Sequence, residues 1–350
     1  MVRYQNVYLE GLAYHLPENV VTSADLEKRL APVYDRLKLP YGRLEMMTGI
    51  AERRFWNEGV FPSDVASKAG EKAIQNSGVE RGEIGCLINA SVCRDFLEPA
   101  TASLVHHNLE LKQNALVFDI SNACLGVLNG MVHVANMIEL GQIQAGLVVA
   151  GENGGPLVDA TIESMLIRSD LTRSEIKTSF ASLTIASAAV GVLLVHKDLS
   201  RYKHRLLGGC SQAASQFNNL CRGSDESETG AESWSPLMQT DAETMMYEGC
   251  KLARHTWSLT KKNLGWDNDD VSRVFCHQVG YMHRKLLYET LSLSLEKDFS
   301  TLEFLGNTGA ASLPSTLALG VEEGCLNTGD KAALLGIGSG LNCLMLGVEW

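Results

Sequence analysis

Short apolar runs alternate along the chain with longer segments in which apolar residues recur every three or four positions. The runs are rich in Val, Ile, Leu and Ala, and they have the length of strands buried on both faces. They predict strands over Cys86–Ala90, Ala115–Ile120, Gly146–Ala150, Ala189–Val195, Val271–Cys276 and Ala332–Ile337. The longer segments predict helices over Ser63–Ser77, Leu125–Leu140, Met245–Leu264 and Leu313–Val321. Strands that alternate with helices favour an α/β architecture with mostly parallel sheets.

The order of elements in the first half of the chain repeats in the second half. In the first half, a strand, a turn with Cys124, a helix and a further strand follow one another. In the second half, one strand ends at His277, a short strand is predicted over Leu302–Leu305, and a turn with Asn307 precedes the next helix. This repetition predicts a duplicated unit, although alternation is common to all α/β proteins. The two predicted units are residues 1–199 and 200–350.

Composition and charge exclude several classes of protein. With 350 residues, 45% of them hydrophobic, the chain can bury a large core, which excludes a disordered or disulfide-stapled protein. A net charge of −11 without a basic cluster disfavours a nucleic-acid partner. The N-terminus lacks the apolar stretch of a secretory signal, and no apolar stretch is long enough to span a membrane. Nine cysteines without a CxxC pair or a Cys/His cluster predict reduced thiols in a cytoplasmic protein and no metal site.

Cys124 differs from the other cysteines because it stands between a predicted buried strand and an apolar helix that begins at Leu125. A thiol at a helix N-terminus meets unsatisfied N–H groups and the positive end of the helix dipole. Both favour the thiolate, which is the nucleophilic form of cysteine. A buried cysteine without a chemical role is the alternative interpretation of this position.

His277 and Asn307 are the polar residues of the second half that stand at ends of predicted elements. His277 ends a buried strand, at the edge of the sheet where α/β active sites gather, and Asn307 lies in the turn Leu-Gly-Asn-Thr-Gly. Each also has a structural interpretation, as a core histidine or a turn asparagine. With Cys124 as acyl carrier, both side chains can donate hydrogen bonds to an oxyanion or enolate. The set is consistent with acyl transfer or carbon–carbon condensation.

The glycine-rich segment Gly336–Gly340 does not match a dinucleotide-binding loop. Its spacing is not GxGxxG, and too few residues follow it to form a binding helix and another strand. A glycine turn after a strand can instead direct backbone N–H groups at an oxyanion. The chain contains neither a P-loop nor a GxSxG motif.

Several sequence blocks contain or adjoin these candidate residues. They are Thr48–Arg54 (TGIAERR), Ser121–Gly126 (SNACLG), Cys276–Val279 (CHQV), Gly306–Gly309 (GNTG) and Leu335–Asn342 (LGIGSGLN). The blocks resemble the thiolase superfamily, and within it the ketoacyl synthase III-like branch, over nearly the whole chain. The block Ser91–Pro99 (SVCRDFLEP) and the C-terminal segment that ends at Trp350 resemble in particular the condensing enzymes that begin bacterial long-chain olefin biosynthesis.

The resemblance implies a thiolase fold, which is a five-layered αβαβα arrangement of two pseudo-symmetric halves, in a homodimer. It implies that a fatty acyl-CoA acylates Cys124 and that His277 and Asn307 hold the thioester oxygen of a second acyl group. The N–H groups of Cys124 and Gly340 would form a further oxyanion hole. Ser339 is a candidate for shaping this loop, or an ordinary serine of a glycine turn.

Two further roles are implied for charged residues. Arg53 and Arg54 are candidates for contacting the CoA phosphates, with a solvated pair as the alternative. Glu98 would reach into the active site of the partner subunit and remove an α-proton from the second acyl-CoA. A synthase that decarboxylates malonyl groups needs no such base, whereas a non-decarboxylating condensation must remove a weakly acidic C–H proton. In a largely apolar channel, desolvation would raise the pKa of Glu98 and make it a better base. A solvated loop carboxylate is the alternative.

The predicted reaction is a non-decarboxylative Claisen condensation of two fatty acyl-CoA molecules to a 2-alkyl-3-oxoacyl product. It uses an acyl-cysteine intermediate and no metal or redox cofactor. Three alternatives stay open: a decarboxylating 3-oxoacyl-carrier-protein synthase III that uses a malonyl carrier, acyl transfer to an oxygen or nitrogen acceptor, and a catalytically silent subunit of a heterodimer. The co-occurrence of Cys124, His277 and Asn307 argues against the silent subunit. The expected partners are acyl-CoA, a second copy of the chain and downstream pathway enzymes.

Overall fold

The computed structural model describes residues 1–224 and 237–350, and it joins most of its strands in one 10-stranded sheet. The strand order is β12-β13-β14-β9-β2-β8-β7-β5-β6, with β1 beside β9, and two separate two-stranded sheets pair β3 with β4 and β10 with β11. The strands are β1 (Val2–Arg3), β2 (Val7–His15), β3 (Asn19–Thr22), β4 (Glu52–Phe55), β5 (Ile84–Asn89), β6 (Leu116–Asp119), β7 (Ala145–Glu152), β8 (Ala188–His196), β9 (His204–Ala213), β10 (Cys221–Ser224), β11 (Leu237–Thr240), β12 (Arg273–Cys276), β13 (Lys331–Gly338) and β14 (Asn342–Glu349).

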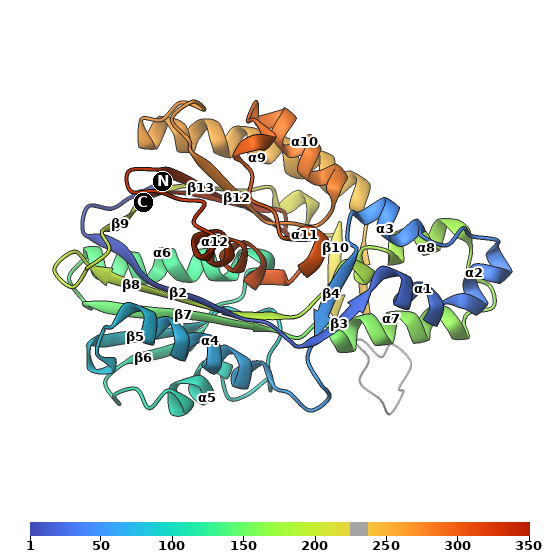
Figure 1. Ribbon diagram of the computed structural model, residues 1–350, viewed down its shortest axis with the longest axis horizontal. Helices are drawn as coiled ribbons and strands as arrows, with labels where there is room; N and C mark the ends of the chain where they lie inside the picture. Colours follow the sequence, from blue (N-terminus) through green and yellow to red (C-terminus); the bar gives the residue numbers. More distant parts are fainter. Residues whose placement is uncertain (225–236) are drawn as a thin grey trace.

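Helices cover both outer faces of the strands and fill the space between their two parts (Figure 1). Helices α4 and α5 pack on β2, β5, β6, β7 and β8 from one side, α9 packs on β9 and β14 from the other, and α6 and α12 lie in the centre. The predicted αβαβα layering is therefore confirmed. The helices are α1 (Ser23–Arg29), α2 (Ala31–Leu37), α3 (Arg43–Thr48), α4 (Pro62–Ser77), α5 (Thr101–Asn108), α6 (Gly126–Glu139), α7 (Gly155–Ile167), α8 (Arg173–Ser179), α9 (Ala242–Leu264), α10 (Tyr281–Leu291), α11 (Leu302–Leu305) and α12 (Ser312–Glu322).

The sheet consists of two parts with equivalent strand orders. The first part runs β2-β8-β7-β5-β6 and the second runs β9-β14-β13-β12. Strands β2 and β9 join the parts through the pairs Tyr8↔Arg205 and Leu9↔His204. This order supports two pseudo-symmetric halves. The boundary after residue 199 stays a prediction, because the sheet is continuous across the two parts.

The prediction of mostly parallel sheets is wrong. Pairs β5–β6, β5–β7 and β12–β13 are parallel, whereas β7–β8, β2–β8, β13–β14 and β14–β9 are antiparallel. The apolar pattern missed β2, β9 and β14, which supply most of the antiparallel pairs. Charged residues and glycines such as Glu10, Arg205 and Gly347 interrupt the apolar runs of these strands.

The segment Leu302–Leu305 is a helical turn, α11, and not the predicted strand. Leu302 and Leu305 are buried while Glu303 and Phe304 between them are exposed, which is the periodicity of a helix. The second half therefore has no strand at the place of β6, and a parallel bridge between Val274 and Asp298 occupies it.

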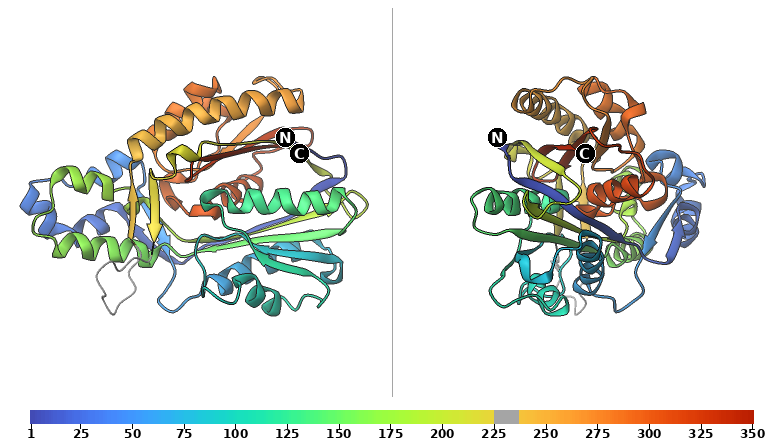
Figure 2. Two further views of the ribbon diagram at one scale, coloured as in Figure 1. Left: turned by 180° about the vertical axis from the view of Figure 1, so that it is seen from behind. Right: turned by 60° about the vertical axis from the view of Figure 1, so that its left-hand side comes forward.

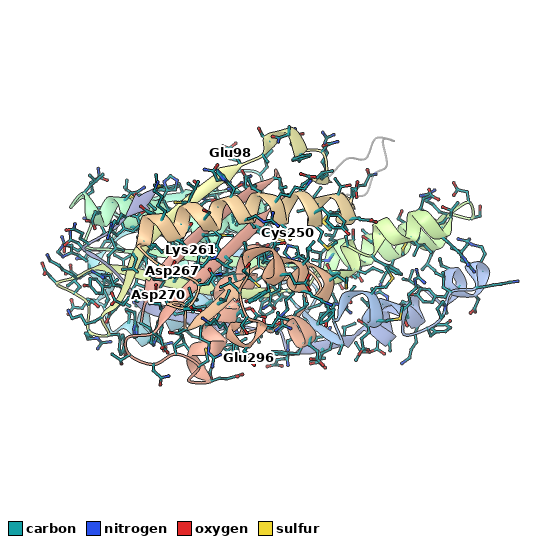
Figure 3. All side chains as sticks on the ribbon, turned by 90° about the horizontal axis from the view of Figure 1, so that it is seen from above. Glu98, Cys250, Lys261, Asp267, Asp270 and Glu296 are labelled. Carbon is teal, nitrogen blue, oxygen red and sulfur yellow. The ribbon has the colours of Figure 1, made fainter. Side chains whose placement is uncertain are left out.

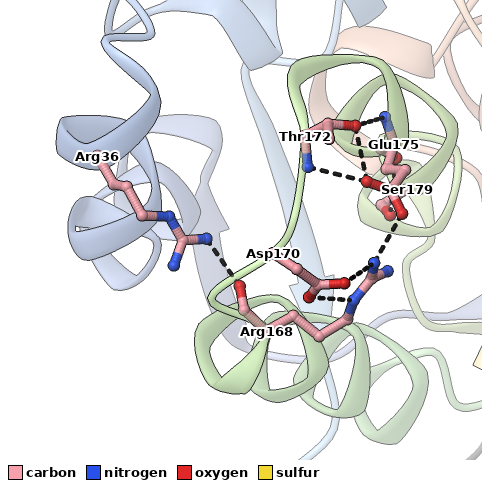
Figure 4. Close-up of polar contacts among 6 residues, drawn as sticks. All are labelled: Arg36, Arg168, Asp170, Thr172, Glu175 and Ser179. Atoms are coloured by element: carbon pink, nitrogen blue, oxygen red, sulfur yellow. Dashed lines mark hydrogen bonds and ion pairs between the residues drawn. The ribbon is translucent and has the colours of Figure 1, made fainter.

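A helical extension formed by α1, α2, α3, α7 and α8 projects from the end of the sheets opposite to the two termini (Figures 1 and 2). Arg168, after α7, holds it together (Figure 4). Its guanidinium binds the carboxylates of Asp170 and Glu175, and its carbonyl oxygen accepts a hydrogen bond from Arg36 of α2. Glu175 in turn forms a capping box with Thr172 at the start of α8.

In the described part of the chain, no helix has the length and apolar character that crossing a bilayer requires.

Candidate active site

Candidate residues follow the carboxyl ends of two parallel pairs of strands, β5 with β7 and β12 with β13. The two pairs are linked because the turn η2 (Ala123–Leu125) packs against β13 and the turn η6 (Gly309–Ala311) packs against β7. Each end is followed by, or ends in, a candidate residue: the loop with Glu98 follows β5, Glu152 ends β7, His277 follows β12, and the turn with Gly340 follows β13. Parallel strands place their carboxyl ends at one edge, where α/β proteins form their binding sites. The extension continues directly from β7 into α7 and therefore lies beside this edge.

Cys124 lies in the turn η2 (Ala123–Leu125) that leads into α6, as the sequence predicted. This turn packs against β13 and against η6 (Gly309–Ala311), the turn after Asn307. Gly338 at the end of β13 approaches so closely that a Cβ there would lie 3.6 Å from the backbone nitrogen of Cys124. The fold thereby joins the nucleophile of the first half to two segments of the second.

The electrostatic surroundings of Cys124 differ from the prediction. Burial, with smaller contributions from the neighbouring Cys221 and Glu152, raises the pKa of its thiol to about 12. Desolvation and nearby negative charge disfavour a thiolate more than the helix N-terminus favours it. Burial thus opposes the effect of the helix N-terminus, and the reactive role of Cys124 stays a prediction.

His277 is buried directly after β12, where its backbone N–H donates to Leu335 of β13. Both of its ring nitrogens are buried, and within the described residues neither has a hydrogen-bond partner. Burial, with a smaller contribution from the nearby His283, lowers the pKa of His277 to about 3. A neutral imidazole with unsatisfied nitrogens fits a hydrogen-bond donor for a substrate oxygen, because unpaired buried polar groups are costly otherwise.

Asn307 is fixed through its backbone and through one side of its amide. Its N–H donates to Thr184, its carbonyl accepts from Ala186, and its side-chain Oδ1 accepts the N–H of Gly309 at 3.1 Å. With Oδ1 engaged, Nδ2 is the free end of the amide, and no residue in the described ranges accepts a hydrogen bond from it. Asn307 therefore presents an N–H donor of fixed orientation.

The turn after β13 is connected to the nucleophile through Asn342. The Asn342 amide donates to the carbonyl of Ser339 and to the side-chain oxygen of Asn122, two residues before Cys124. Asn122 donates in turn to Asn129 of α6. Ser339 thus takes part through its backbone carbonyl. Asn122 and Asn342 lie within the blocks Ser121–Gly126 and Leu335–Asn342, but the sequence alone assigned neither of them a role.

Glu98 lies apart from these residues, in the exposed loop that follows β5. Its side chain is at the outer edge of the molecule (Figure 3), and its neighbours Phe96 and Leu97 are exposed as well. Leu97 is 96% exposed, which is unusual for a large apolar side chain. A role for Glu98 in the partner's site stays a prediction.

The predicted contact of Arg53 with CoA phosphates is wrong. Arg53 is fully buried on β4, where it donates to Ser23, and burial lowers its pKa to about 10. Solvent-borne phosphates cannot reach such a side chain. Arg54 is half-buried and donates to the carbonyl of Pro17, and its phosphate contact stays a prediction.

Sequence reasoning also missed Glu152, the buried carboxylate at the end of β7. It accepts hydrogen bonds from the N–H groups of Val92, Cys93 and Ala310. A single charged residue that ends an entirely apolar strand was the available signal.

Comparison with known proteins places this geometry in a family. Family models match the N-terminal domain of thiolases over residues 45–180 and the C-terminal domain of 3-oxoacyl-[acyl-carrier-protein] synthase III over residues 261–350. An acyl-CoA:acyl-CoA alkyltransferase of Shewanella oneidensis is 44% identical over 100% of both chains. Another, from Xanthomonas campestris, is 37% identical over 99% of both.

The chain belongs to the OleA family of the thiolase superfamily. A structure of Xanthomonas campestris OleA with bound cerulenin covers 100% of this chain and 98% of that one, with a TM-score of 0.93 and 37% identity. A structure of the same protein with bound lauric acid and lauroyl-CoA covers 99% of this chain and 100% of that one, with a TM-score of 0.92. The predicted superfamily, branch and fold are confirmed.

Proposed function

We propose that this member of the OleA family condenses two fatty acyl-CoA molecules, without decarboxylation, to a 2-alkyl-3-oxoacyl product. The observation that supports the proposal is that the turn with Cys124 packs against β13 and against η6, the turn after Asn307, while the unpaired imidazole of His277 follows β12, the neighbour of β13. The printed names of the relatives, acyl-CoA:acyl-CoA alkyltransferases, support the substrate class.

In the first step, Cys124 takes the acyl group from one acyl-CoA. The C–S bond to Cys124 forms, the C–S bond to CoA breaks, and the thiol proton leaves with CoA. The N–H groups of Cys124 and Gly340 stabilise the tetrahedral oxyanion. Because the resting thiol is neutral, it becomes nucleophilic only as it loses its proton to the departing sulfur.

In the second step, a base removes the α-proton of another acyl-CoA, and the resulting enolate attacks the acyl-Cys124 carbonyl. The new C–C bond forms as the C–S bond to Cys124 breaks. His277 and Asn307 donate N–H groups to the enolate oxygen, which suits neutral donors because they do not protonate it outright. No electrons are exchanged, so the sequence of steps needs neither an oxidant nor a redox cofactor.

We assign the base to Glu98 of a second copy of the chain. Its loop exposes Val92, Phe96 and Leu97, and Phe61 beside Phe96 adds to this apolar surface. An exposed apolar loop of this kind marks a contact with another protein surface. Burial in a homodimer would also desolvate Glu98 and raise its basicity. The unpaired state of all nine cysteines supports a cytoplasmic setting.

One incubation tests the function. The purified protein is mixed with a single long-chain acyl-CoA and no malonyl compound, and the products are identified by mass. We expect acyl-Cys124, free CoA and a 2-alkyl-3-oxo acid or its thioester. A requirement for malonyl carrier with release of CO2 would establish the decarboxylating alternative, and transfer to an added alcohol or amine would establish the acyl-transfer alternative.

A further inference from the structure

Glu152 is a buried carboxylate that the proposed reaction does not use. It is 3% exposed at the end of β7. Within the described ranges it forms no ion pair with Lys, Arg or His, and backbone N–H groups together with the Cys93 thiol stabilise its charge. A carboxylate held in this way is costly unless each oxygen has partners of good geometry. Burial raises the pKa of Glu152, and the N–H donors lower it in part.

The donors to Glu152 belong to two segments that are distant in sequence. Oε1 accepts the N–H of Val92 at 2.9 Å and that of Ala310 at 3.1 Å, and Oε2 accepts the N–H of Cys93 at 3.2 Å. Val92 and Cys93 begin the loop that carries Glu98. Ala310 belongs to η6, the turn that follows Asn307. One carboxylate thus connects the loop after β5 to the turn before α12.

The turn after Asn307 is shaped around this carboxylate. Gly309 has a φ of +58°, and a Cβ there would lie 3.1 Å from Cδ of Glu152. The same Gly309 donates its N–H to Oδ1 of Asn307, which leaves Nδ2 as the free donor. The position of Glu152 therefore fixes Gly309 and Ala310, and through Gly309 it fixes the orientation of the Asn307 amide.

The charge of Glu152 also acts on the nucleophile. It adds to the effect of burial on the pKa of Cys124, with Cys221 of β10 as the other contributing group. Its influence reaches Cys93, whose pKa burial and Glu152 raise well above the usual value. Glu152 therefore touches or influences the nucleophile, the Asn307 turn and the base-carrying loop.

We propose that Glu152 is a positioning residue for the condensation step, which holds the Glu98 loop and the Asn307 turn in fixed relation through its three N–H acceptor contacts. The proposal rests on the proposed function. Because Glu98 acts in the partner's site, Glu152 connects the base of one site to the oxyanion donor of the other. The requirement is for a carboxylate: Gln has only one acceptor oxygen and would turn an N–H donor toward the N–H of Cys93.

The experiment separates the two chemical steps in the full-length protein. Glu152→Gln keeps the size of the side chain and removes one acceptor and the charge, whereas Glu152→Asp keeps the charge and shortens the reach. Glu27→Gln is the matched control, because Glu27 is also buried and also accepts two backbone N–H groups, from Gly42 and Leu44. Acylation of Cys124 is followed by intact mass, condensation by product, and thiol reactivity by iodoacetamide between pH 6 and 9.

We expect Glu152→Gln to acylate Cys124 within about threefold of the wild-type rate. Condensation falls about 10²-fold, the cost of catalytic groups misplaced by about 1 Å. Alkylation of Cys124 at pH 7 becomes about three- to tenfold faster, because removal of a nearby negative charge lowers the thiol pKa. Glu152→Asp loses condensation without the faster alkylation. Glu27→Gln changes neither the rate of condensation nor the rate of alkylation relative to wild type.

Two results would overturn the proposal, and a third would exclude the electrostatic effect of Glu152 on Cys124. Condensation at the wild-type rate by Glu152→Gln would show that the contacts are not needed. Equal loss of acylation and condensation, in Glu152→Gln or in Glu152→Asp where the first does not fold, would indicate a merely structural carboxylate. Unchanged alkylation in Glu152→Gln would remove the electrostatic link to Cys124. Failure of the wild-type protein to condense would contradict the proposed function instead, and the alkylation comparison would still test the link.

Discussion

The two halves of this molecule place different chemistry at equivalent positions of the same strand order. The entrance to α6 in the first half carries Cys124, and the entrance to α12 in the second carries Asn307. The loop after β5 leads to the exposed Glu98, whereas β12 leads directly to the buried His277. In the proposed reaction, the first half supplies the groups that make bonds or move protons, and the second supplies neutral hydrogen-bond donors. Equivalent positions of the two halves thus carry different residues with different proposed roles.

The connections between strands differ as strongly as the chemistry. Between β7 and β8 the first half inserts residues 153–187, which form α7 and α8 of the helical extension. Between β13 and β14 the second half has only Ser339–Leu341. The long insertion forms the helical extension, while the strand end before the short turn brings Gly338 next to Cys124.

Removal of the nucleophile gives the largest expected effect. Cys124→Ala should form no acyl-enzyme and no condensation product, because it removes the sulfur that carries the acyl chain in the proposed reaction. Intact mass after incubation with acyl-CoA measures the first loss, and product analysis measures the second. Cys325→Ala, a half-buried cysteine of the second half, is the control and should remain active. Acylation of Cys124→Ala at another residue would assign the nucleophile elsewhere.

Removal of a donor from the second half tests the division of roles directly. Asn307→Ala should lower condensation about 10²- to 10³-fold, the usual cost of losing one oxyanion donor, while Cys124 still becomes acylated. Rapid-quench measurement of CoA release and of product separates the steps. Asn76→Ala, on the exposed surface of α4, controls for a lost amide. If Asn307→Ala abolished acylation too, the second half would serve both steps.

The pKa values of the two halves predict a pH dependence. Burial raises the pKa of Cys124 to about 12 and lowers that of His277 to about 3, so both groups are neutral near pH 7. The thiolate fraction, and with it the rate of alkylation by iodoacetamide, should rise about tenfold per pH unit from pH 6 to 9. His277 should not titrate in this range. A plateau below pH 8 would instead indicate a thiolate–imidazolium pair between the halves.

Two glycines with positive φ distinguish the site from its scaffold. Gly309 contacts the carboxylate of Glu152, whereas Gly324, which follows α12 with a φ of +71°, has nothing within 4 Å of an added Cβ. Alanine at either position should destabilise the fold by about 1–2 kcal/mol through backbone strain. Only Gly309→Ala should also lower kcat, by about tenfold, because it displaces the Asn307 turn. Thermal unfolding and kcat together measure the difference, and equal kcat values would separate Gly309 from the site.

Apolar periodicity predicted the strands that are buried on both faces, such as β7, and the helices that cover them. It missed β2, β9 and β14, whose charged residues and glycines interrupt the pattern, and therefore missed the antiparallel pairs. Cys124, His277 and Asn307 could be proposed because each ends an element and carries a reactive side chain. The role of Glu152 could not, because its partners are backbone N–H groups from segments that only the folded chain brings together. The burial of Arg53 could not be predicted either, because it too depends on contacts that only the folded chain forms.

The helical extension, which the second half lacks, should respond least to substitution. Hydrogen bonds from Thr172 and contacts with Arg168 lower the pKa of Glu175 to about 2. Since this value lies below the unfolded one, the contribution to stability is present above about pH 4 and is lost as the pH falls toward 2. Glu175→Gln should lower the melting temperature at pH 7 by no more than about 2 °C, because exposed ion pairs contribute little. The difference from wild type should vanish near pH 2, and condensation should be unchanged. A large loss of activity would show that the extension shapes the site as directly as the glycine turn after β13 does.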